Sequence, residues 1–238
     1  MKFKKIMTYL LIVTLVLVMS GCGNDNTKNS YENDNNSNKQ ENNSTSNDYE
    51  NNYEEPVVEY SESDQMIMKI MTLIDEGLAF DTGSYLKGDI PKGEYAFIKF
   101  EGSGSYYSEE DAAGNIIDNE NFDSFGYVKV HGVGDIETRG VLIKVSAFEK
   151  LEVSSAKEIY EILNEQEDYN QSGYYKVGVD IKPGTYTVES FGNGYYAILD
   201  GPIGDYDIID NDFFKGKATI RLKKGQYLNL SSAQILEK

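Results

Sequence analysis

One pattern recurs along the C-terminal part of the chain, and it constrains the fold more than any other feature. Residues 81–95 match residues 171–186, about 90 positions later, with tyrosines, a glycine, an Asp-Ile pair and Gly-x-Tyr in the same order. Three further blocks repeat at nearly the same offset: a Gly-rich turn with a Tyr-Tyr pair, an Ile-Ile-Asp-Asn run and a strand-like run. Because one spacing is kept through four blocks, we infer an internal duplication.

Each copy begins with a segment of helical periodicity. In Ser61–Leu78 and again in Ser154–Glu165, apolar residues recur three or four positions apart. In both segments a serine is followed three residues later by an acid, which is the spacing of an N-terminal cap pair. We therefore expect one amphipathic helix at the start of each copy, with its apolar face packed on a sheet.

Alternating apolar and polar residues follow each helix, which is the pattern of half-buried strands. The predicted strands are Tyr95–Phe100, Tyr127–His131, Leu142–Val145, Tyr186–Phe191, Tyr195–Leu199, Ala218–Leu222 and Tyr227–Leu230. The predicted fold class is mainly β with α (α+β), in two tandem units. Each unit is an amphipathic helix followed by a small antiparallel β-sandwich or barrel-like module. The predicted boundaries are 57–152 and 153–238.

The N-terminus has the layout of an export signal. Three lysines precede a fourteen-residue apolar run from Ile6 to Met19, which as a helix would span about 21 Å and is too short for a bilayer core of about 30 Å. The run ends in Met-Ser-Gly-Cys at 19–22 and resembles the lipobox of bacterial lipoproteins, with Met19 in place of the usual leucine. The resemblance implies a signal peptide over residues 1–21 and acyl chains, such as palmitate, on Cys22.

Residues 22–56 are predicted to be a disordered tether. Between Gly23 and Glu55, asparagine occupies 12 of 33 positions and aliphatic residues are almost absent, so the segment cannot bury enough surface to offset the entropy of ordering. We expect the folded part to be held on the extracytoplasmic face of the cell membrane. Its contact with the lipid bilayer would rest on the acyl chains of Cys22.

The charge of the chain excludes one class of partner. The net charge is −18, and it becomes −21 without residues 1–21, which hold three lysines and no acid. A surface of this sign repels a phosphate backbone, so we expect no nucleic-acid partner.

The repeated block also resembles a known module. Tyr175–Tyr186 is similar to a repeat of secreted and lipid-anchored proteins of Gram-positive bacteria, with the approximate pattern Tyr-x-Val-Gly-x-Asp-Ile-Pro-x-Gly-x-Tyr. Here the proline is displaced by one position, and the first copy lacks one residue between Gly88 and Asp89. The family has no established activity, so the resemblance implies an extracytoplasmic β module of uncharacterised function.

Two tyrosine pairs are the candidate ligand-facing aromatics: Tyr106 with Tyr107, and Tyr195 with Tyr196. Neighbouring strand residues face opposite sides, so one ring of each pair should enter the core. The other ring could stack on a sugar or a protein, and ordinary cross-strand aromatic packing is the alternative interpretation.

Acidic residues supply the one candidate metal site. Asp205, Asp207, Asp210 and Asp212 are hard oxygen ligands at short spacing, which would suit Ca²⁺. The run lacks the glycine and terminal glutamate of an EF-hand, and Ile208-Ile209 within it are expected to be buried in a strand. A polar turn without metal is therefore the alternative.

No catalytic residue is predicted. His131 is the single histidine. A Cys-His nucleophile would need it together with the single cysteine, which is the predicted acylation site, so we expect His131 to be solvated at a strand end. The sequence favours a non-catalytic binding or interaction module at the cell envelope, with a cell-wall polymer or surface protein as partner. The alternatives are a carboxylate-type glycan-acting enzyme, which needs two acids in one cleft, and a calcium-stabilised surface domain.

Overall fold

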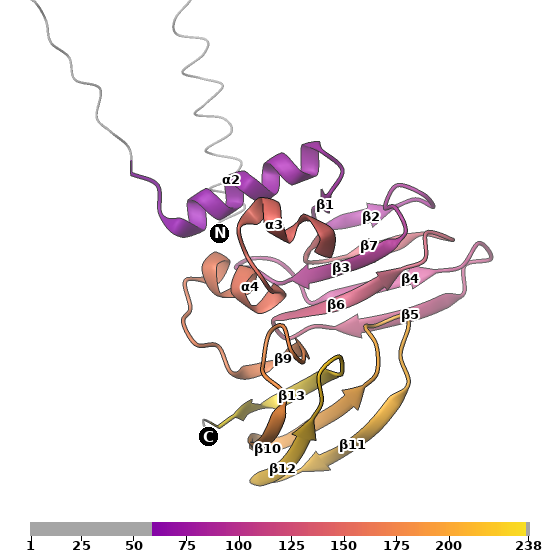
Figure 1. The fold of residues 1–238 in the computed structure, drawn as a ribbon. Helices are drawn as coiled ribbons and strands as arrows, with labels where there is room; N and C mark the ends of the chain where they lie inside the picture. The colour runs from indigo at the N-terminus through magenta and orange to yellow at the C-terminus, as the bar shows by residue number, and fades with distance from the viewer. Residues whose placement is uncertain (1–58, 237–238) are drawn as a thin grey trace, which may run out of the picture. The chain divides into compact units, whose positions relative to one another are not determined.

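Three helical segments and thirteen strands make up the described part of the chain, residues 59–236 of a computed structural model (Figure 1). The predicted signal peptide, Cys22 and the predicted tether lie outside the described residues. From Tyr60 onward the chain forms one compact unit. None of the helices described in 59–236 has the length and apolar character needed to cross a membrane.

Both predicted helices are present and are capped as the sequence indicates. The helices are α2 (Glu62–Asp75), α3 (Phe148–Leu151), which follows a 3₁₀ turn at Val145–Ala147, and α4 (Ala156–Asn164). The Ser61 hydroxyl accepts the Asp64 N–H at 3.0 Å, and the Ser155 hydroxyl accepts the Glu158 N–H at 3.1 Å. Each cap satisfies an N–H group that has no partner inside its helix.

The strands form three antiparallel sheets. The N-terminal strands (β1–β8) make two sheets in the orders β1-β8-β3-β6 and β2-β7-β4-β5, and the C-terminal strands (β9–β13) make one sheet in the order β11-β10-β13-β9, with β12 paired to β10. The prediction of a mainly β chain with helices and antiparallel sheets is confirmed. The strand bounds are β1 Ala79–Phe80, β2 Gly83–Tyr85, β3 Gly93–Ile98, β4 Tyr106–Glu110, β5 Ile116–Asn121, β6 Phe125–Val130, β7 Ile136–Thr138, β8 Val141–Lys144, β9 Gln171–Lys176, β10 Gly184–Leu199, β11 Ile208–Phe214, β12 Lys217–Leu222 and β13 Tyr227–Ile235.

The strand pairing is the same in both sets of strands. In the N-terminal set, β3 pairs with β6 and β8, whereas β4 pairs with β5 and β7. In the C-terminal set the long strand β10 takes the place of β3 and β4: its first part pairs with β12, its second part pairs with β11, and both parts pair with β13. The register also agrees at equivalent positions, as in Tyr107↔Glu120 and Tyr196↔Asp212.

The tyrosines of the repeated block have a structural role that recurs in both sets of strands. Four of them donate their hydroxyl to the backbone carbonyl four residues earlier, which fixes the start of a strand. The pairs are Tyr85 with Asp81 at 2.8 Å, Tyr95 with Pro91 at 2.7 Å, Tyr175 with Gln171 at 2.5 Å and Tyr186 with Lys182 at 2.6 Å.

Both longer helices lie on the N-terminal strands. Helix α4 packs against α2 and over β3 and β6, although it directly precedes the C-terminal strands in sequence. Figure 1 shows α2, α3 and α4 gathered on the side of the molecule away from β10–β12. Among residues 59–236 no helix covers the C-terminal sheet in this way, and its strand β9 packs against β6 instead.

Aromatic rings join the two sets of strands. Phe125 and Tyr175 meet edge to face with centroids 5.0 Å apart, and Tyr127 meets Tyr227 in the same way at 5.7 Å. Strand β6 lies so close to the ring of Phe122 that position 126 requires glycine, because a Cβ atom on Gly126 would lie 2.0 Å from that ring. One continuous hydrophobic core therefore includes residues from both sets.

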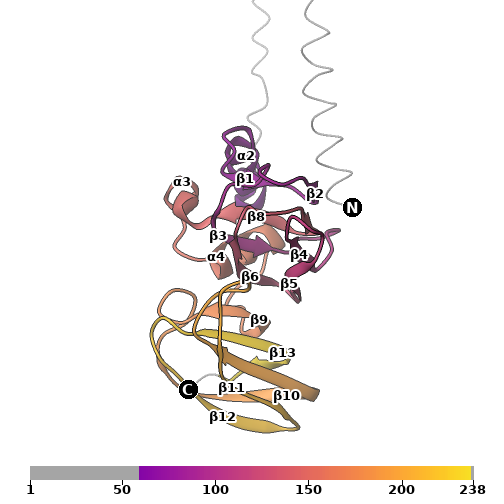
Figure 2. The same cartoon turned by 90° about the vertical axis from the view of Figure 1, so that its right-hand side faces the viewer.

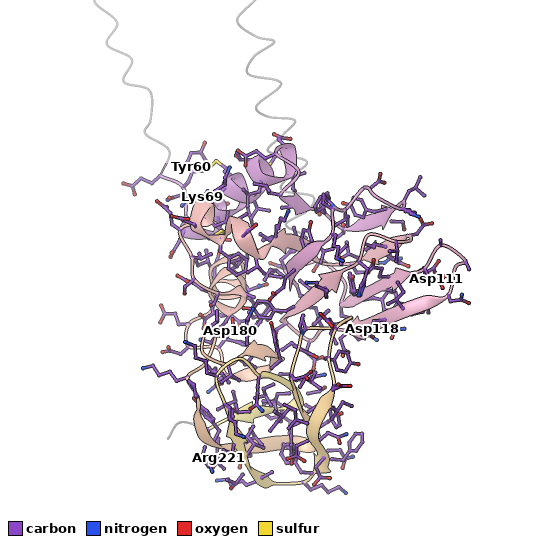
Figure 3. All side chains as sticks on the ribbon, turned by 45° about the vertical axis from the view of Figure 1, so that its right-hand side comes forward. Tyr60, Lys69, Asp111, Asp118, Asp180 and Arg221 are labelled. Atoms are coloured by element: carbon purple, nitrogen blue, oxygen red, sulfur yellow. The ribbon has the colours of Figure 1, made fainter. Side chains whose placement is uncertain are left out.

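A buried carboxylate ties the same junction together. Asp180, labelled in Figure 3, accepts the Tyr127 hydroxyl at 3.0 Å, the Lys157 N–H at 3.0 Å and the Lys176 N–H at 2.6 Å. It thereby connects the turn after β9, the start of α4 and strand β6. Its counterpart Asp89 closes the equivalent turn by accepting a backbone N–H at 2.9 Å, but it is exposed to solvent.

Candidate ligand-binding site

A cavity of about 480 Å³ lies between the two sets of strands. One side is formed by β5 and the turn after it, and the other by β9, β10, β11, β13 and the loop between β10 and β11. Figure 2 shows β5 facing the C-terminal sheet across this junction. The volume is in the range of small-molecule sites in proteins.

The strand register explains the wall formed by the C-terminal sheet. Paired residues of neighbouring strands share one face of a sheet, as do residues two apart along a strand. One row across the sheet contains Tyr174, Asn229 and Ala197, and the next contains Ser231, Tyr195 and Phe213. All six residues line the cavity, and the rings of Tyr195 and Phe213 lie 4.8 Å apart.

The opposite wall contributes two acids. Glu120 of β5 and Asp123 of the following turn line the cavity, and each carboxylate is held by a donor from β13. The Asn229 amide donates to Glu120 at 3.4 Å, and the Ser231 hydroxyl donates to Asp123 at 3.0 Å. The two carboxylates are therefore fixed in place by the sheet that they face.

The Glu120 carboxylate lies in an unfavourable electrostatic environment. Burial raises its pKa above the ordinary value, and the neighbouring carboxylates of Asp118 and Asp123 raise it further; the Asn121 N–H, 2.8 Å away, opposes the shift. Burial also raises the pKa of the Tyr206 phenol at the cavity wall, and the carboxylates of Asp118 and Glu120 raise it further. These shifts have one electrostatic cause in common, an excess of negative charge.

The Tyr174 hydroxyl is buried and has no hydrogen-bond partner among the described residues. Only 1% of the residue is exposed, and its ring meets Phe122 edge to face at 5.9 Å. Burial, followed by the charge of Glu120, raises its pKa well above the ordinary value. Buried polar groups in proteins are nearly always paired, so this hydroxyl is an exception, and the Tyr107 hydroxyl is a second one.

The four tyrosines singled out from the sequence have different positions. Tyr107 and Tyr196 are buried, whereas Tyr106 and Tyr195 are half-buried. Tyr195 lines the cavity, and the other three do not. The two pairs therefore do not form matching exposed platforms in the described structure.

The four aspartates of the predicted calcium site lie along an exposed segment. Asp205 and Asp207 line a second, more open hollow of about 660 Å³, and Asp210 and Asp212 lie on β11. Within residues 59–236 no group of three or more His, Cys, Asp or Glu side chains is arranged to hold a metal ion. The calcium site stays a prediction.

The expectation that Ile208 and Ile209 are buried is wrong, since 55% and 51% of these residues are exposed. The reason is that β11 is the edge strand of its sheet, and in the described structure no helix covers it.

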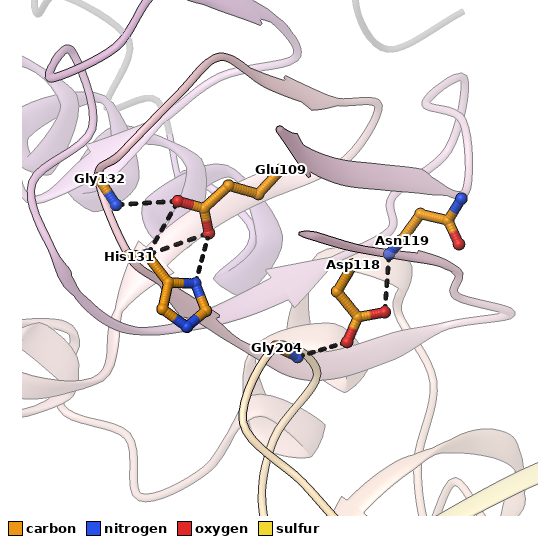
Figure 4. A network of polar contacts seen from close by, with 6 residues as sticks. All are labelled: Glu109, Asp118, Asn119, His131, Gly132 and Gly204. Atoms are coloured by element: carbon orange, nitrogen blue, oxygen red, sulfur yellow. Dashed lines mark hydrogen bonds and ion pairs between the residues drawn. The ribbon is translucent and has the colours of Figure 1, made fainter. Parts of the chain in front are cut away.

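The expectation of a solvated histidine is also corrected. His131 is half-buried, and its Nδ1 atom lies 3.0 Å from the carboxylate of Glu109 (Figure 4). Glu109 is 1% exposed and also accepts the backbone N–H groups of His131 and Gly132, at 2.9 Å each. The same figure shows Asp118, which accepts the Gly204 N–H at 2.8 Å. Glu109, His131 and Asp118 therefore hold turns and loops in place.

Most of the cavity was not predicted from the sequence. Glu120, Asp123, Tyr174, Tyr206 and Phe213 were not among the candidates, although the alternation in β5 places Glu120 and Phe122 on one face. What the sequence lacked was the information that this face is turned toward the C-terminal sheet.

Comparisons with protein-family models, with curated proteins and with solved structures gave no match.

Proposed function

We propose that the chain is a non-catalytic binding module of the cell envelope and that the cavity beside β5 is its ligand site. Two fixed acids and a wall of aromatic rings support this proposal. The observation that carries it is the pair of carboxylates on the cavity wall, Glu120 and Asp123, which donors from β13 hold in place.

The N-terminal motif supplies the location in this proposal. The chain would be a lipoprotein, anchored on the extracytoplasmic face of the membrane by acyl chains on Cys22 and held away from the bilayer by residues 22–56. Its partner would be a cell-wall polymer or a surface protein. The acidic net charge of −18 argues against nucleic acid.

We also propose that the two sets of strands are tandem copies of one module. The matching strand pairings support this, and so do the four tyrosine hydroxyl bonds at equivalent positions. In this proposal the ligand site is not duplicated, because the cavity uses one face from each copy.

Two exposed phenylalanines of the C-terminal sheet allow a matched test. Phe213 is 78% exposed and lines the cavity, whereas Phe191 is 58% exposed and does not. We expect Phe213→Ser to reduce retention of the full-length chain on isolated cell walls about tenfold, and Phe191→Ser to leave it unchanged. Equal retention of both variants and the unchanged protein would contradict the assignment of this cavity. Melting temperatures of the two variants control for folding.

One observation favours a second function. The raised pKa of Glu120 beside Asp123 is the property of a general acid, and glycan hydrolysis uses such a pair of carboxylates. A carboxylate-type enzyme would release reducing sugar from cell-wall glycan, and Glu120→Gln would abolish that release. A binding module would retain the glycan without cleaving it.

A further inference from the structure

The charges that line the cavity have one sign. Glu120 and Asp123 both contribute carboxylates, and among the described residues that line the cavity there is no lysine, arginine or histidine. Asp118 adds negative charge from the same strand, and it raises the pKa of Glu120. A positively charged group that enters the cavity would be attracted, whereas a phosphate or carboxylate would be repelled.

Aromatic rings cover much of the remaining wall. The faces of such rings carry partial negative charge and attract cations, including those that cannot donate a hydrogen bond. The rings that line the cavity belong to Phe122, Phe125, Tyr174, Tyr195, Tyr206 and Phe213.

The same junction already contains a cation in surroundings of this kind. The Lys176 ammonium lies 5.4 Å from the ring centroids of both Tyr127 and Tyr227, and 2.6 Å from the carboxylate of Glu94. Two rings and an acid thus surround a half-buried ammonium group in this fold. The cavity offers the same groups, two acids and several rings, but no lysine of residues 59–236 lines it.

We propose that the cavity binds an organic cation, with its ammonium group beside Glu120 and Asp123 and its carbon body against the aromatic wall. This inference rests on the proposed function of the cavity as a ligand site. The ligand would be an amine or a quaternary ammonium compound that is small enough to fit a cavity of about 480 Å³.

Choline and neohexanol, its uncharged carbon isostere, separate charge from shape. In calorimetric titrations of the full-length chain we expect choline to bind about tenfold more tightly than neohexanol. The double variant Glu120→Gln and Asp123→Asn should lose this preference and leave neohexanol binding unchanged. Phe213→Ser should weaken both probes. Glu149→Gln, an exposed acid on α3, is the matched control and should change neither.

The outcomes distinguish the two proposals. Equal affinity for choline and neohexanol, both sensitive to Phe213→Ser, would overturn the cation class and keep the cavity as a site. If neither probe binds while retention on cell walls still depends on Phe213, the cation class is likewise overturned. Choline binding that is insensitive to Phe213→Ser and to the double variant would place the cation elsewhere and overturn the inference.

Discussion

Glu120 lies where the requirements of folding and of ligand binding conflict. Its carboxylate is partly removed from water, it faces two other acids, and in the described structure no cation lies within its cavity. Desolvation and like charge both disfavour its ionised form. A residue of this kind lowers stability unless a ligand compensates, and we therefore expect it to serve binding rather than folding.

Glu120→Gln tests this cost. Because folding raises the pKa of Glu120, the unfolded chain loses its proton at a lower pH, and stability falls as the pH rises from the unfolded pKa, near 4.5, to the folded pKa. The variant should melt above the unchanged protein at pH 7, by about 1–3 °C. The difference should vanish below about pH 4, where both states are protonated.

Melting curves of both proteins between pH 3.5 and 7 provide the measurement. Glu149→Gln on α3 should show no such pH-dependent gain, because its side chain is exposed. A Glu120→Gln protein that melts at or below the unchanged protein at neutral pH would mean that the carboxylate stabilises the fold.

At the scale of elements, the turn that contains Asp180 has a role that the equivalent turn with Asp89 lacks. Asp89 and Asp180 each close the turn before the Ile-x-x-Gly segment by accepting a backbone N–H. Asp180 is half-buried whereas Asp89 is exposed, and only Asp180 also receives the Tyr127 hydroxyl and the start of α4. The Asp180 side chain thus serves both its own turn and the junction between the two sets of strands.

Asp180→Ala and Asp89→Ala form a matched pair of variants. Removal of Asp180 leaves three donors without their acceptor at a buried position, so we expect a loss of about 3 kcal/mol in the free energy of unfolding. Asp89→Ala removes one exposed bond and should cost about 0.5–1 kcal/mol. Urea denaturation of the full-length variants measures both values. Equal losses would show that burial at the junction contributes nothing to the role of Asp180.

The sequence predicted the elements better than their partners. Local signals identified the two capped helices and six of the thirteen described strands (β3, β6, β8, β10, β12 and β13), because capping and alternation depend on neighbouring residues. The sequence divided β10 into two strands, and within β11 it indicated only Ile208 and Ile209 as strand residues. Edge strand β11 is exposed, and its sequence Ile-Ile-Asp-Asn-Asp-Phe-Phe groups apolar and polar residues in runs, so it lacks the alternation that burial imposes. The placement of α4 on the N-terminal sheet depends on long-range packing that periodicity does not encode.

At the scale of the whole molecule, the two sets of strands share one core and one helix layer. Helix α4 follows the N-terminal strands in sequence and packs on them, while its first turn is bound by Asp180 from the C-terminal set. Neither set would keep its contacts if the other unfolded. The two sets of strands therefore depend on each other for stability.

This mutual dependence predicts a single unfolding transition from Tyr60 onward. Far-ultraviolet circular dichroism reports both strand sets and the helices, and tyrosine fluorescence reports the aromatic junction, since the chain has no tryptophan and 19 tyrosines. The two signals should change at the same urea concentration. Asp180→Ala should shift the single transition without splitting it. Two separate transitions would show that the modules fold independently.

The tyrosine bonds of the repeated block have a consequence for evolution. All four bind the chain's own carbonyl groups, and of residues 81–95 and 171–186 only Gly173 and Tyr174 line the cavity. Selection on the block can therefore preserve the architecture while most cavity residues change freely. Proteins that share this pattern are expected to share a scaffold and to differ in what they recognise, so their ligands should be inferred from residues outside the pattern.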